Sequence, residues 1–250
     1  RTAMLDEASR EFRRVAELIE PLRAPVLAVA GNHDLPQPLR ARFGGESERI
    51  VDAWRILTVE TFVDGQIHGA VDLDAVLRRL GHDEGRPTLL ALHHPPITPS
   101  ANPWFELRDG AELVAVLADR SDVKLVVGGH LHDVFRVVCG GVTYLGAPST
   151  WYSLEHTGNE FRPDDGPVGA MRIDLFPDGR FDAVVVEREP HPAGAPSMGP
   201  SAWAAPTVGQ QMAVARADDR RLFDRYEMIH WTAASRPTRG DDTIWRASHD

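Results

Sequence analysis

The feature that most limits the possible folds is a set of short apolar runs, each ending abruptly at a glycine or a histidine. Residues 26–30, 88–92 and 123–127 are such runs, and polar residues hardly interrupt them. Strands with this pattern are typical of a parallel sheet that is covered on both faces. Between the runs, apolar residues recur at steps of three and four, which predicts amphipathic helices. The expected helices cover residues 5–22, 72–80 and 111–117. Helices that alternate with buried strands predict an α/β fold.

After residue 129 the pattern changes to closely spaced strands joined by short turns such as Pro177-Asp178-Gly179. We expect these strands to form an antiparallel meander. They cover residues 135–139, 142–145, 170–176 and 181–187, and a further strand is expected earlier, over residues 54–61.

Local composition divides the chain into three segments. Residues 1–189 carry the helix and strand patterns and are expected to form one domain. Residues 190–206 contain five prolines and no charged side chain, so we interpret them as a Pro/Ala-rich linker. Residues 207–250 form a tail, in which apolar spacing predicts a helix over residues 208–229.

Charge and cysteine content exclude several classes of protein. The chain has 27 Lys and Arg against 37 Asp and Glu, a formal net charge of −10. Such an acidic chain lacks the broad basic surface that binds duplex nucleic acid. A single cysteine, Cys139, excludes an intramolecular disulfide and a cysteine-rich zinc site. No stretch approaches the roughly 18 apolar residues of a membrane span.

Histidines gather where the apolar runs end. The segments are Gly-Asn-His-Asp at 31–34, His-His-Pro-Pro at 93–96 and Gly-His-Leu-His at 129–132. In an open α/β sheet the carboxyl ends of the strands meet at the crevice where ligands bind. We therefore expect the three segments to converge on one site. Imidazoles and an amide oxygen suit Zn, Mn or Fe, because cysteine is not available there.

The ordered motifs GNHD, HHPP and GHLH resemble the downstream half of the calcineurin-like metallophosphoesterase superfamily. The surrounding sequence (ALHHPPI, then GGHLH) is most similar to bacterial class III 3',5'-cyclic-nucleotide phosphodiesterases. The resemblance covers about residues 1–189. It implies a four-layer α/β/β/α sandwich with mixed sheets, and a centre of two divalent or trivalent metal ions (Mn, Fe or Zn).

The resemblance also implies a role for each residue of the site. Asn32, His93 and His130 would bind one metal ion, and His132 the other. His33 would be catalytic at the leaving group, where it stabilises or protonates the departing oxygen while a metal-activated hydroxide attacks phosphorus. The remaining expected site residues are Asp34, which would hold the His33 ring, and His94, which would support the metal ligands or contact the substrate. His68 would line the substrate crevice or lie in a solvated loop.

The sequence departs from the family pattern at its beginning. The D-x-H and G-D-x-x-D motifs, which would supply two aspartates and a histidine, are absent. We therefore expect an N-terminally incomplete domain that lacks its first strands and leaves apolar faces of residues 5–22 and 26–30 uncovered. With neutral ligands alone, two cations would repel strongly. The sequence as printed is expected to hold one metal ion or none, and to be catalytically impaired.

The favoured function is a metal-dependent phosphodiesterase acting on a small phosphate ester, with a cyclic nucleotide as the favoured substrate. The alternatives are a non-catalytic binding protein that keeps the fold and a phosphomonoesterase of the same superfamily. A cytoplasmic location and a homodimer are also expected. Trp104 and Phe105 could stack on a base or staple a loop to the core, whereas His156 shows no pattern of partners.

Overall fold

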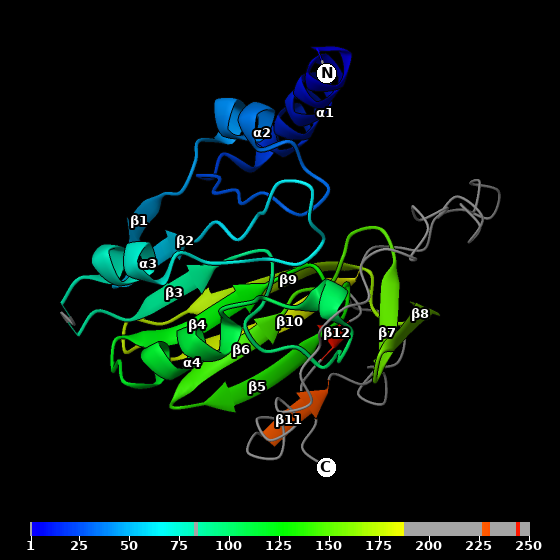
Figure 1. Cartoon of the computed structure of the whole chain (residues 1–250). Helices are drawn as coiled ribbons and strands as arrows, with labels where there is room; N and C mark the ends of the chain where they lie inside the picture. The colour runs from blue at the N-terminus through cyan, green and yellow to red at the C-terminus, as the bar shows by residue number, and fades with distance from the viewer. Residues whose placement is uncertain (1, 83–84, 188–226, 231–243, 246–250) are drawn as a thin grey trace.

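The computed structural model describes residues 2–82, 85–187, 227–230 and 244–245. Its main sheet has the strand order β1–β2–β3–β4–β6–β5–β11. These strands are β1 (Glu48–Val51), β2 (Trp54–Thr58), β3 (Thr88–Ala91), β4 (Val123–Gly128), β5 (Phe135–Cys139), β6 (Val142–Gly146) and β11 (Glu227–His230). The neighbours β2, β3, β4 and β6 pair in parallel. Strand β1 pairs antiparallel with β2, and β5 pairs antiparallel with both β6 and β11. The predicted α/β fold with a mixed sheet is confirmed (Figure 1).

A second sheet covers one face of the main sheet. It consists of β9 (Gly169–Leu175), β10 (Phe181–Glu187) and β12 (Ile244–Trp245), with β10 in the centre and both pairings antiparallel. The two sheets share an apolar layer, to which β9 and β10 contribute residues such as Ile173 and Ala183. Trp54 is buried in this layer and its Nε1–H donates to the Phe176 carbonyl at 2.7 Å. The indole therefore joins the two sheets by both packing and a hydrogen bond.

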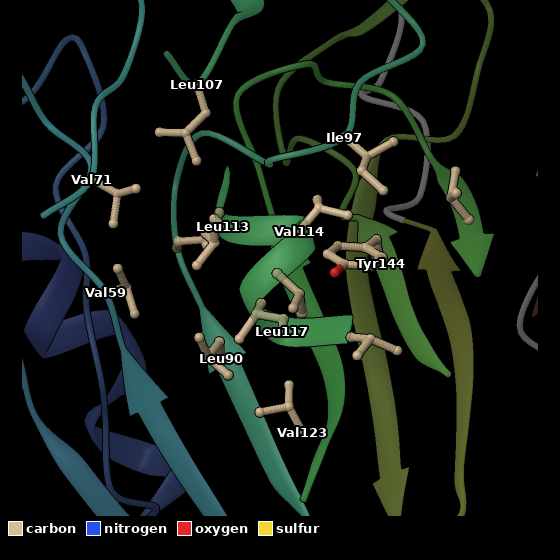
Figure 2. Packing of buried hydrophobic residues seen from close by; sticks show 14 of the residues in the cluster. Val59, Val71, Leu90, Ile97, Leu107, Leu113, Val114, Leu117, Val123 and Tyr144 are labelled. Atoms are coloured by element: carbon tan, nitrogen blue, oxygen red, sulfur yellow. The ribbon is translucent and has the colours of Figure 1, made fainter. Parts of the chain in front are cut away.

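Two helices cover the other face of the main sheet. They are α3 (Leu73–Leu80), capped by the Asp72 carboxylate, and α4 (Gly110–Ala118). Figure 2 shows Leu113 and Leu117 of α4 packed among residues of the strands, among them Leu90 and Val123. Helices, main sheet and second sheet account for three of the four expected layers within the described residues.

The remaining elements lie at the ends of the main sheet (Figure 1). A two-stranded hairpin of β7 (Ser153–Thr157) and β8 (Glu160–Asp164) was not expected from the sequence. Two short helical turns are η1 (Glu20–Leu22) and η2 (Pro103–Phe105). Helix α1 (Thr2–Ile19) packs on α2 (Pro36–Phe43). Phe12 and Phe43 meet edge to face in this contact. Helix α2 was also missed, because prolines at 36 and 38 obscure its pattern.

The expected strand over residues 26–30 is wrong, because this run forms no regular element and pairs with none of the described strands. No described strand lies beside it to complete a ladder, and Val26 is 40% exposed. The expected apolar face of residues 5–22 is only partly uncovered. Val15 is 45% and Leu22 71% exposed, whereas Phe12 meets Phe43 and Ala16 is buried.

The tail differs from expectation where it is described. Residues 227–230 form strand β11, which pairs antiparallel with β5, so the predicted helix does not extend to Ile229. An edge strand offers unpaired backbone N–H and C=O groups, and a strand that pairs with it satisfies the hydrogen bonds of both strands. The linker at 190–206 and the rest of the predicted helix lie outside the described residues. No helix in the described part of the chain is long and apolar enough to span a membrane.

Replacing Trp54 by phenylalanine should lower the free energy of unfolding by about 1–3 kcal/mol. The change removes the indole donor from the Phe176 carbonyl, which keeps its bond from the Gly179 N–H, and it empties part of the layer between the sheets. Denaturant unfolding checks this, with Trp151→Phe as the control because Trp151 is 54% exposed. An equal loss of stability in both variants would contradict the role assigned to Trp54.

Candidate metal centre

The three histidine segments meet at the carboxyl edge of the main sheet. Donor atoms of His93, His94 and His130 all lie within 4.8 Å of one another. The ring centroids are 4.8 Å apart for His93–His94, 5.0 Å for His93–His130 and 4.4 Å for His94–His130. Asn32 joins the group, because its Oδ1 lies 3.1 Å from His93 Nε2. The predicted convergence of these segments is therefore present in the structure.

The first segment reaches the site through a tight turn. The Asp34 N–H donates to the Gly31 carbonyl, and the Asp34 carboxylate accepts from the Gly31 N–H at 2.8 Å. Asp34 was expected to hold the His33 ring, but the hydrogen bond that the structure gives its carboxylate closes the turn instead. Asn32 is half-buried and His33 is exposed, so His33 is open to an approaching ligand.

Gly31 is required by a close approach to His93. A Cβ atom built on Gly31 would lie 2.7 Å from His93 Cε1 and 3.0 Å from its Nε2. Any side chain at this position would therefore push the imidazole out of its present place. Gly69 stands in the same relation to His94, whose Cγ would lie 2.5 Å from an added Cβ.

His94 is fully buried and both of its ring nitrogens are occupied. The Ile67 carbonyl can only accept, so Nε2–H donates to it at 2.9 Å, and Nδ1 then accepts from the Thr61 hydroxyl at 2.9 Å. This arrangement leaves neither nitrogen for a substrate or a metal ion. We therefore interpret His94 as a support that ties the loop around residues 61–69 to the site.

His130 and His132 lie in a strained turn. Their φ angles are 66° and 52°, and the left-handed conformation costs a residue other than glycine roughly 1–2 kcal/mol. His130 Nε2–H donates to the Trp104 carbonyl at 2.9 Å, which leaves Nδ1 available as a ligand. His132 packs 4.3 Å from the Tyr152 ring, and its buried Nδ1 has no hydrogen-bond partner among the described residues. A bound cation would satisfy that nitrogen.

The imidazoles favour the neutral form that metal ligation requires. Burial, followed by the neighbouring imidazoles, lowers the pKa of His130 to about 3. Burial likewise lowers the pKa values of His94 and His132 to about 4, and the pKa of His93 falls well below its ordinary value. The charges that lower these pKa values belong to other histidines. The cluster of possible ligands in the described residues contains no carboxylate.

His68 is half-buried in the loop that supports His94. Its pKa is lowered by burial and by the nearby Arg108 guanidinium, and its Nε2 has no hydrogen-bond partner within the part of the chain described. The structure does not include it in the cluster of possible ligands. Its expected contact with the substrate stays a prediction.

Sequence reasoning missed two groups that hold the cluster in place. One is the Trp104 carbonyl, and the other is His156, whose Nε2 lies 2.9 Å from the Leu131 carbonyl. Phe105 is buried, and its ring centroid lies 5.2 Å from that of His130. This position favours the interpretation that Phe105 fixes a loop to the core over the interpretation that it stacks on a base. Neither a backbone carbonyl nor a histidine on an unexpected hairpin leaves a signal in the sequence.

Comparison with known proteins agrees with this geometry. Residues 6–134 match the family described as calcineurin-like phosphoesterase. A probable cyclic nucleotide phosphodiesterase of Synechococcus is 35% identical over 187 residues, which cover 70% of each chain. The 3',5'-cyclic adenosine monophosphate phosphodiesterase CpdA of Escherichia coli K12 is 31% identical over 198 residues, or 72% of this chain and 70% of CpdA.

A third relative, described as a cAMP/cGMP dual specificity phosphodiesterase of Mycobacterium tuberculosis, is 32% identical over 194 residues. These residues cover 70% of this chain and 60% of the relative. The family match spans more than half of the chain and includes the three histidine segments. The chain belongs to the calcineurin-like phosphoesterase family, whose members are metal-dependent phosphoesterases.

Proposed function

We propose that the protein hydrolyses a small phosphodiester, with a 3',5'-cyclic nucleotide as the favoured substrate. The observation that carries this proposal is the contact between Asn32 Oδ1 and His93 Nε2 at 3.1 Å, beside His130. An amide oxygen and imidazoles brought together at a sheet edge suit a metal centre better than a structural core. The names of the relatives support the choice of a cyclic nucleotide.

Asn32, His93 and His130 would hold one metal ion, and His132 would face a second in a complete centre. Mn, Fe and Zn all suit these ligands, and a bound ion would supply an activated water and neutralise charge on the phosphate. The donor set fits a cation, because the imidazoles are neutral and His132 Nδ1 lacks a partner among the described residues. No carboxylate in this set offsets the repulsion between two cations, so we propose that one ion binds.

The chain's own residues would bind and orient the ester. The ester would lie at the edge of the sheet, beside Asn32 and His93. His33 is exposed beside them and can donate a proton to the departing oxygen. No side chain is required as a nucleophile, so no covalent intermediate forms. The hydrogen bond from His94 to the Ile67 carbonyl holds the loop around residues 61–69, and the bond between Asp34 and the Gly31 N–H holds the turn at 31–34.

A non-catalytic binding protein is the second candidate, and the carboxylate-free cluster favours it. It would bind a metal ion or a nucleotide without hydrolysing the ester. A phosphomonoesterase of the same family would be distinguished from a phosphodiesterase by hydrolysing a phosphomonoester in preference to cyclic AMP. The further expectations of no duplex nucleic acid as partner, a homodimer and a cytoplasmic location stay predictions.

Substituting His33 by alanine should reduce hydrolysis of bis(p-nitrophenyl) phosphate, measured with added Mn²⁺, by about 10²–10⁴-fold. Asn32→Ala should abolish the same activity, because it removes a proposed ligand. The exposed His82 serves as the control, and His82→Ala should keep the wild-type rate. Cyclic AMP and a phosphomonoester are then compared as substrates. Activity that survives both site substitutions would refute the proposed site, and Mn²⁺ binding without any hydrolysis would favour the binding protein.

Replacing Gly31 by alanine should weaken Mn²⁺ binding by about tenfold or more, because the added methyl group displaces the His93 ring. Isothermal titration calorimetry measures the affinity and the number of ions bound, for which we expect one. Gly45→Ala is the matched control, since the nearest atom to its added Cβ is 3.9 Å away. The proposed ligand set fails if both variants bind Mn²⁺ as the wild type does.

The metal-free protein should lose stability as the pH falls from 6.5 towards 4. The unfolded chain takes up protons on histidine near its ordinary pKa of 6.5, whereas folded His94 and His132 have pKa values of about 4. The stabilisation is complete above pH 6.5 and shrinks below it. Melting temperatures measured between pH 7.5 and 5 check this, and His94→Gln should flatten the slope. A melting temperature that stays constant over this range would contradict the assigned burial.

A further inference from the structure

Strand β7 is bonded to the backbone on both sides of His132. The Leu154 N–H donates to the His132 carbonyl at 3.1 Å. Two residues further along the same strand, His156 Nε2–H donates to the Leu131 carbonyl at 2.9 Å. The Leu131 carbonyl can only accept, which assigns the proton to Nε2 of His156. One strand thus holds two successive carbonyl groups of the turn that carries the proposed ligands.

These two hydrogen bonds act on the two torsion angles of His132. The φ angle describes how the peptide group between Leu131 and His132 is oriented, and the ψ angle does so for the next peptide group. His156 fixes the first group and the Leu154 N–H fixes the second. His132 has a φ of 52°, a conformation that persists only when its surroundings over-determine it.

The His156 ring is itself held firmly enough to act in this way. It meets Phe105 edge to face with ring centroids 4.5 Å apart, and Phe105 is 5% exposed. Phe105 also lies 5.2 Å from the His130 ring, so the same aromatic side chain touches both imidazoles. The other nitrogen of His156, Nδ1, is buried and has no hydrogen-bond partner in the described chain. The bond to Leu131 is therefore the polar contact that orients the ring.

We infer that His156 is a positioning residue: its hydrogen bond to the Leu131 carbonyl holds His132 in the left-handed conformation that aims its imidazole at the metal centre. The inference rests on the proposed function in taking His132 as a ligand. His156 touches neither substrate nor metal, and it acts through the backbone of the turn. Loss of the bond lets the peptide group rotate and the His132 ring leave its place.

Two polar substitutions at residue 156 separate positioning from packing. In His156→Gln the amide nitrogen can reach the place of Nε2, whereas the shorter side chain in His156→Asn places its nitrogen near Nδ1. The same turn also carries His130, a proposed ligand of the bound ion. Mn²⁺ affinity, measured by calorimetry, should therefore fall about tenfold or more in His156→Asn and stay within about threefold of wild type in His156→Gln. His156→Phe, which keeps the aromatic contact without a donor, should behave like the asparagine variant. Equal affinities in all four proteins would overturn the inference.

A second measurement needs no metal ion. Hydrogen exchange of the Leu154 amide, followed by NMR in the metal-free protein, should accelerate at least tenfold in His156→Asn and not in His156→Gln. The Val126 amide in the centre of the main sheet is the internal control and should not change. If both amides accelerate by the same factor, the substitution merely destabilises the fold and the inference is wrong. If wild type binds no Mn²⁺ but Leu154 exchange responds as expected, the proposed metal centre fails while the positioning of His132 stands.

Discussion

The site depends on the parallel pairing of β3 with β4. Ala91 pairs with Val127 in this register, so the loops that follow the two strands leave the sheet at the same level. The pairing continues past the strands, because the Gly129 N–H donates to the His93 carbonyl at 3.0 Å. His93 and His130 are 37 residues apart in the sequence, yet their rings lie 5.0 Å from each other. A shift of one residue between the strands would separate them.

Close packing of uncharged imidazoles makes this edge chemically unusual. Protonating any one of them would place a charge in a dry environment beside the others, so burial lowers their pKa values. Neutral imidazoles have lone pairs to offer, and the supporting hydrogen bonds decide which nitrogen offers one. In His94 both nitrogens are used internally, whereas in His130 the bond to the Trp104 carbonyl leaves Nδ1 available. Identical side chains thus have different roles because their partners differ.

Much of the scaffold could be predicted from patterning. Strands β5 and β10 have the bounds that the apolar pattern predicts, and α3 begins after the Asp72 cap, because these signals are local. The run at 26–30 has an equally strong pattern but forms no strand, since a strand requires a neighbour and none of the described strands lies beside it. Strand β11 shows the opposite case, in which the exposed edge of β5 draws a segment with a helical pattern into the sheet.

The sequence by itself determined that asparagine and histidine side chains would gather where buried strands end, and the motifs indicated the family. Only the tertiary structure decided how each side chain is used. Asp34 bonds to the Gly31 backbone, His94 is enclosed by Thr61 and Ile67, and His156 reaches the turn from a hairpin. Periodicity reports which face of an element is buried, because burial acts on every residue of that face. A single hydrogen bond between distant segments depends on the packing of the whole chain, so no local pattern encodes it.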